Sequence, residues 1–145
     1  MTPDAENPAL YRTLRDVLQR QVEVVSVWFE PDAIQKRFLA AEVDPHRVVP
    51  ATGPDPPRVE VHWKLIPPHD EFRIDYADPN TAFHCGWHQD ADHDDLGAAH
   101  FQYQTISMER PAYESTVFEA ESPPKLLWEC CEALFEDVIP EYTRT

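Results

Sequence analysis

The sequence is poor in glycine: only Gly53, Gly86 and Gly97 occur among its 145 residues. A glycine-rich loop that cradles phosphate groups needs several glycines close together, so nucleotide binding of that kind is excluded. The Gly-x-Ser-x-Gly turn that carries the nucleophile of α/β-hydrolases is also missing. The chemistry of this chain must therefore lie in other residue types.

Long hydrophobic runs are missing as well. No stretch approaches the roughly 18 apolar residues that a membrane-spanning helix needs, and residues 1–7 lack the basic and apolar regions of a secretory signal. We therefore expect a cytoplasmic protein with no membrane partner. The length fits a single domain over residues 1–145.

Cysteine is scarce, and its positions argue against disulfides. Cys130 and Cys131 are adjacent in a helical pattern, where consecutive side chains point about 100° apart, so they predict neither a disulfide nor a Cys-x-x-Cys metal site. Together with Cys85 they are expected to be buried as small apolar residues in a reducing compartment.

Basic residues are few. Lys and Arg together number 12 against 27 acidic residues, which gives a net charge of −15, and the only lysines are Lys36, Lys64 and Lys125. Acid dispersed along a lysine-poor chain is typical of proteins from a high-salt cytoplasm. At molar salt the Debye length is about 3 Å, so the charge does not exclude an RNA ligand, although it removes the usual basic-patch argument for one.

Apolar spacing and turn residues predict helices at both ends of the chain and strands between them. The expected helices cover residues 9–20 and a long segment that Ser122 caps, with an apolar stripe of Leu127, Leu134 and Val138. Strands are expected at residues 22–30, 36–43, 58–66, 71–77, 81–90, 100–106 and 113–120. Residues 36–43 could also form a helix, but that helix would be short and would lack a glycine stop, so a strand is favoured. This order predicts an α+β fold: a curled antiparallel sheet of five to seven strands with an N-terminal and a C-terminal helix packed on one face.

Four of the predicted strands agree on which side chains share a face, because successive side chains point to opposite sides of a sheet. The apolar face collects Val59, Val61, Trp63, Leu65, Phe72, Ile74, Tyr76, Phe83, Cys85, Trp87, Phe101 and Tyr103. The polar face collects His62, Arg73, Asp75, His84, His88 and His100. We expect this polar face to be exposed to solvent.

The polar face has the residue types that acid–base chemistry needs. Histidine has the side-chain pKa nearest neutrality, and an Arg and a carboxylate beside imidazoles shift their pKa values in opposite directions. The candidate catalytic residues are His84, His88, His100, Arg73 and Asp75, and no cofactor is expected.

A metal site is an alternative. His84 and His88 lie four residues apart on a predicted strand, about 13 Å, and cannot share a metal ion without help. A better set is His88 and Asp90, about 7 Å apart by the same rise, joined by His93 or His100.

The run FRIDYADPNTAFHCGWHQDADHDDLGAAHFQ, followed by the C-terminal helix, resembles the TumE family of toxin–antitoxin proteins over roughly residues 58–139. In that family an Arg-x-Asp strand leads into a histidine-rich segment. Arg73 and Asp75 match the Arg-x-Asp step, and His84, His88 and His100 match the histidines. The resemblance implies a small toxin that acts on RNA or translation and is neutralised by a helix-turn-helix antitoxin.

Residues and resemblance together suggest a metal-independent ribonuclease. One histidine of His84, His88 and His100 would take the 2′-hydroxyl proton, another would protonate the leaving 5′-oxygen, and Arg73 would stabilise the charge on phosphate. Two alternatives remain open: a non-catalytic module that binds a protein partner, and a small metal-binding protein that uses His88, Asp90 and His93 or His100.

If the dispersed acid is an adaptation to salt, the fold should be most stable in molar KCl. Near 0.1 M salt the Debye length grows to about 10 Å and like charges repel across the surface, so the melting temperature should fall. Thermal unfolding monitored by circular dichroism across this range checks the expectation. A melting temperature that stays constant or rises as salt is removed contradicts it.

Overall fold

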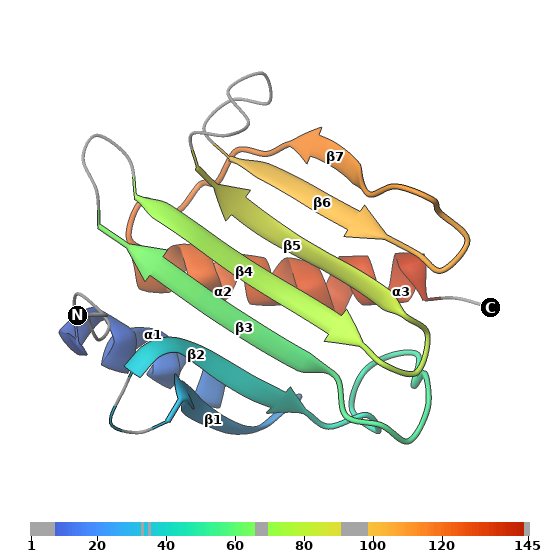
Figure 1. The fold of residues 1–145 in the computed structure, drawn as a ribbon, viewed down its shortest axis with the longest axis horizontal. Helices are drawn as coiled ribbons and strands as arrows, with labels where there is room; N and C mark the ends of the chain where they lie inside the picture. Colours follow the sequence, from blue (N-terminus) through green and yellow to red (C-terminus); the bar gives the residue numbers. More distant parts are fainter. Residues whose placement is uncertain (1–7, 33, 35, 66–69, 91–98, 144–145) are drawn as a thin grey trace.

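The computed structural model describes residues 8–32, 34, 36–65, 70–90 and 99–143. Its main feature is a seven-stranded antiparallel sheet in which the strands lie side by side in sequence order (Figure 1). The strands are β1 (Val24–Pro31), β2 (Lys36–Val43), β3 (Arg58–Lys64), β4 (Glu71–Asp78), β5 (Phe83–Gln89), β6 (His100–Gln104) and β7 (Ala112–Ser115).

The helices cover one face of the sheet. Helix α1 (Pro8–Gln19) and helix α2 (Pro123–Ala133) contact each other and lie on the same side of the strands (Figure 1). The predicted α+β fold, with both terminal helices on one face, is confirmed. Within the described ranges, no helix is long and apolar enough to cross a membrane.

The C-terminal helix differs from the uninterrupted one that the sequence predicts. After α2 the chain makes a π-helical turn, η2 (Leu134–Val138), and continues as α3 (Ile139–Tyr142). The backbone N–H of Ile139 reaches back five residues to the carbonyl of Leu134, and Pro140 has no N–H to donate. Ser122 occupies the N-cap position, but its side chain makes no capping hydrogen bond, so that part of the prediction is wrong.

Alternation along the strands builds the core. In β4, Phe72, Ile74 and Tyr76 are buried beneath the helices while Arg73 and Ala77 are exposed. The apolar stripe of the C-terminal helices is buried against these strands, as predicted. Leu65 is the exception on the apolar face: it is 44 % exposed because it lies beyond the end of β3.

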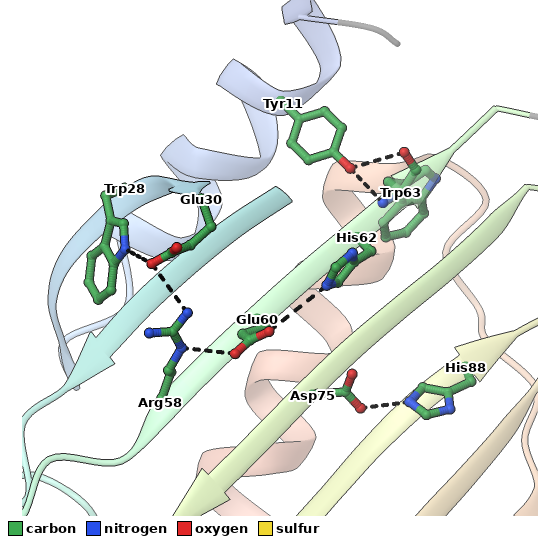
Figure 2. A network of polar contacts seen from close by, with 9 residues as sticks. All are labelled: Tyr11, Trp28, Glu30, Arg58, Glu60, His62, Trp63, Asp75 and His88. Atoms are coloured by element: carbon green, nitrogen blue, oxygen red, sulfur yellow. Dashed lines mark hydrogen bonds and ion pairs between the residues drawn. The ribbon is translucent and has the colours of Figure 1, made fainter. Parts of the chain in front are cut away.

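A buried tyrosine fixes α1 to the sheet. The Tyr11 hydroxyl accepts a hydrogen bond from the Trp63 N–H (2.8 Å) and donates one to the Trp63 carbonyl oxygen (3.1 Å), as Figure 2 shows. The pairing of β2 with β3 ends at Leu39 and Val61. Tyr11 thus satisfies backbone groups that have no strand partner there, which an apolar side chain could not do.

The last strand is shorter than predicted. β7 ends at Ser115, whereas the sequence predicts a strand to residue 120. The N–H groups of Glu119 and Ala120 donate instead to the Glu129 carboxylate on α2, at 3.4 and 3.1 Å. The backbone therefore leaves the sheet to join the helix layer.

The three cysteines are free and buried, as expected. Burial raises the pKa of Cys131 to about 12 and also raises the pKa values of Cys85 and Cys130. Reactive thiolates need the opposite environment, so these thiols serve packing.

Trp87 is a test of the core. Its side chain is 6 % exposed and packs on Phe101, with ring centroids 4.9 Å apart. Trp87→Ala should lower the free energy of unfolding by about 3 to 5 kcal/mol, because the cavity cannot collapse fully. Trp128 on α2 is 38 % exposed, so Trp128→Ala should change the free energy of unfolding by only about 0.5 kcal/mol. Equal losses of unfolding free energy in the two variants, measured by urea denaturation, would contradict the placement of Trp87 in the core.

Candidate functional site

A row of polar side chains crosses the open face, by which we mean the face of the sheet opposite the helices. His62 on β3 is the cross-strand partner of Arg73 on β4, Arg73 is the partner of His88 on β5, and His88 is the partner of His100 on β6. Neighbouring strands are about 5 Å apart. The row therefore alternates imidazole, guanidinium and imidazole over a short distance.

Asp75 joins this row through a close contact with His88. The Nε2–H of His88 donates to Asp75 Oδ1 at 2.6 Å (Figure 2). Asp75 is the cross-strand partner of Gly86, so its carboxylate reaches His88 diagonally over that glycine. A Cβ atom on residue 86 would lie 2.2 Å from Asp75 Oδ1 and 3.0 Å from His88 Nε2. Only glycine leaves room for this hydrogen bond.

The expectation that the whole polar face is exposed is wrong for His88 and His100. The His88 side chain is 3 % exposed, and His100 is 1 % exposed as a residue. Their rings pack edge to face with centroids 5.3 Å apart, and the His100 ring lies 5.7 Å from that of Tyr113. Large neighbouring rings thus cover polar groups that alternation alone assigns to solvent.

One nitrogen of His88 finds no partner in the part of the chain that the structure describes. This buried Nδ1 makes no hydrogen bond to any described residue. In a neutral imidazole with the proton on Nε2, Nδ1 is an acceptor. Leaving a buried acceptor unsatisfied costs about 1 to 3 kcal/mol, so this nitrogen needs an explanation.

His84 does not belong to this group. It is exposed, and its cross-strand partners are Ala77 and Gln104. Four strand residues separate it from His88, about 13 Å. The structure therefore brings together four of the five predicted site residues, Arg73, Asp75, His88 and His100, and leaves His84 outside.

His62 is the functional candidate that the predicted site set omits. Its side chain is 42 % exposed and stacks on Phe38, with centroids 4.2 Å apart. Burial lowers the pKa of His62 below its ordinary value of 6.5, although Glu60 and Asp75 act in the opposite direction. The sequence does signal this residue, because alternation places it on the same face as Arg73.

The cations of the open face differ in how they are paired. Figure 2 shows Arg58 held by two carboxylates, Glu60 at 2.9 Å and Glu30 at 3.3 Å. Arg73 has no carboxylate partner within 4.0 Å among the described residues and is exposed. Its charge is available to an anionic ligand, whereas that of Arg58 is already neutralised.

Taken together, His62, Arg73, Asp75 and His88 form what we call the acid–base cluster. An imidazole with a lowered pKa can accept a proton near neutral pH, a free guanidinium can stabilise an anion, and a carboxylate–imidazole pair can hold a proton. The side chains that could perform these three functions lie on the neighbouring strands β3, β4 and β5.

A metal centre has no support in the described part of the chain. There, no three His, Cys, Asp or Glu side chains are placed to hold a metal ion. The alternative set of His88, Asp90 and His100 is therefore not assembled. His93, the other ligand of that hypothesis, lies outside the described residues.

Comparisons of the chain with models of known protein families, with curated proteins and with solved structures find no match. The resemblance to the TumE family stays a prediction.

Gly86→Ala tests whether the glycine exists to permit the contact between Asp75 and His88. The new methyl group would displace the Asp75 carboxylate, and loss of this part-buried hydrogen bond should cost about 1 to 3 kcal/mol in urea denaturation. The control is a double-mutant cycle with Asp75→Ala, in which the methyl group no longer meets a carboxylate. If the losses of unfolding free energy in the two single variants simply add up in the double variant, Gly86 contributes to stability for a reason other than this contact.

Proposed function

We propose that the acid–base cluster cleaves RNA without a metal ion. The observation that carries this proposal is the row in which Arg73 lies between His62 and His88 on adjacent strands. A phosphodiester bound by the Arg73 guanidinium would have the His62 imidazole on one side and the Asp75–His88 pair on the other. Metal-free cleavage of RNA needs a base and an acid on either side of the phosphate and a cation that binds it.

In the proposed reaction the 2′-oxygen of the RNA displaces its 5′-oxygen from phosphorus. His62 takes the proton of the 2′-hydroxyl, the 2′-oxygen attacks phosphorus, and the bond to the 5′-oxygen breaks. In this proposal the Asp75–His88 pair starts with one proton more than a carboxylate and a neutral imidazole. Asp75 passes that proton to the leaving 5′-oxygen, which leaves a carboxylate and a neutral imidazole, and Arg73 stabilises the charge on the phosphate oxygens. The products are a 2′,3′-cyclic phosphate and a 5′-hydroxyl, and exchange with solvent restores both protonation states.

This assignment differs from the one made on the sequence alone. His62 takes the role of general base because it is half-exposed, whereas His88 and His100 are buried. His88 then acts through Asp75, whose side chain is 41 % exposed. His100 packs behind His88 and fixes the orientation of its ring.

Net charge is the main physical argument against an RNA substrate. At −15 the protein repels a polyanion over about 10 Å in 0.1 M salt. In molar salt the repulsion extends only about 3 Å, and contact with a free Arg73 can dominate. Cleavage should therefore be assayed in molar KCl.

The biological role follows from the resemblance to the TumE family. We infer that the chain is the toxin component of a toxin–antitoxin pair, with a helix-turn-helix antitoxin as its partner. A toxin of this kind inhibits growth through its cleavage activity, so variants without activity should also lose toxicity.

Replacement of His62 or Arg73 should abolish RNA cleavage without unfolding the protein. His62→Ala should lower the rate about 10²- to 10⁴-fold, and Arg73→Lys should also impair it strongly because a point charge lacks the guanidinium's bidentate geometry. Stability should change by only about 0.5 kcal/mol, since both side chains are partly or fully exposed.

His84→Ala is the matched control for these variants, because it removes an exposed histidine from the same face outside the cluster. It should keep full activity. Folded His62→Ala protein that cleaves RNA like wild type would refute the proposal. Wild-type protein that cleaves no RNA but binds a protein partner through this face would select the binding-module alternative.

The pH dependence should identify His62 as the base. Because only neutral imidazole accepts a proton and the pKa of His62 lies below 6.5, the rising limb of the kcat/KM profile should have its midpoint below pH 6.5. Glu60 raises the pKa of His62, so Glu60→Gln should move that midpoint to lower pH. A midpoint that does not move would argue against His62.

A further inference from the structure

A hollow in the surface lies directly beside the acid–base cluster. It is lined by His62, Trp63, Lys64, Glu71, Phe72, Arg73, Gln89 and Asp90. Its volume is about 220 Å³, below the roughly 300 to 1,000 Å³ of pockets for drug-sized ligands. The size suits one nucleobase rather than a larger molecule.

The hollow contains opposite charges that do not neutralise each other. Lys64 and Glu71 are direct cross-strand partners, the arrangement in which opposite charges usually attract. Among the described residues, however, neither side chain forms an ion pair within 4.0 Å. An ammonium donor and a carboxylate acceptor are thus both available to a ligand at this end of the sheet.

A neighbouring amide is held in place. Gln89 Nε2 donates to the Asp70 carbonyl oxygen at 2.6 Å. This hydrogen bond fixes which end of the amide is the donor.

We propose that this hollow binds a guanine base, so that the protein cleaves RNA on the 3′ side of guanosine. Guanine is the RNA base whose Watson–Crick edge carries an acceptor, O6, beside two adjacent donors, N1–H and N2–H. The Lys64 ammonium donates to O6, and the Glu71 carboxylate accepts from N1–H and N2–H.

The other three RNA bases do not match the Lys64 ammonium and the Glu71 carboxylate. Uracil turns O2 toward the carboxylate, cytosine turns N3 and O2 toward it, and adenine offers no O6 to the ammonium. A binding site disfavours ligands that leave its polar groups unpaired, and the Glu71 carboxylate is half-buried. The selectivity therefore comes from the mismatched groups as much as from the matched ones.

The position of the hollow connects recognition with cleavage. His62 and Arg73 belong both to its lining and to the acid–base cluster. A guanosine seated in it would place its 3′-phosphate next to them. This inference rests on the proposed ribonuclease function for its biological meaning, but the binding itself can be measured separately.

The experiment titrates wild-type protein with guanosine, adenosine, cytidine and uridine 3′-monophosphates in molar KCl, by calorimetry. Guanosine 3′-monophosphate should bind about tenfold more tightly than the others, the equivalent of one charge-assisted hydrogen bond. Glu71→Gln should remove this preference, whereas Glu114→Gln on β7 should keep it. Equal affinities for the four nucleotides, or a preference that survives in Glu71→Gln, would overturn the inference.

Cleavage of the dinucleotides GpU, ApU, CpU and UpU separates this inference from the proposed function. Cleavage without base preference would overturn the guanine site and leave the ribonuclease standing. Selective binding of guanosine monophosphate without any cleavage would support the guanine site and refute the ribonuclease. Neither binding nor cleavage would refute both.

Discussion

The packing of two helices against only one face of the sheet is the constraint on which the rest of this protein depends. Each of the strands β3 to β6 must bury alternate side chains beneath α1 and α2, so the intervening side chains are held together on the open face. Their positions cannot shift by one residue, because such a shift would expose the whole apolar set. The core thereby fixes the row of His62, Arg73, His88 and His100.

The open face then departs from a simple solvated surface. His88 is buried and hydrogen-bonded to a carboxylate, while its other nitrogen has no partner. Gly86 makes this arrangement possible, because any other residue would place a Cβ atom within 2.2 Å of Asp75 Oδ1. A glycine within a strand weakens the sheet. Here the glycine lies at the contact between His88 and Asp75.

The elements themselves could be predicted from the sequence. The starts of β3, β4 and β6 fall where alternation and turn residues predict them. The pattern of residues 36–43 fits a strand or a short helix, and the structure has the strand. These features depend on neighbours a few residues apart, and local periodicity determines them. The end of β7 and the π-helical turn at Leu134–Val138 could not be predicted in this way, because contacts with Glu129 and the missing N–H of Pro140 decide them.

The sequence by itself determined the α+β class and the sheet face on which His62, His84, His88 and His100 lie. Only the tertiary structure decided which of these side chains lie together. Cross-strand register places His62 beside Arg73 and separates His84 from His88, and ring packing buries His88 and His100. Register and burial depend on residues far apart in the chain, whereas the face of a side chain depends only on the period of its own strand.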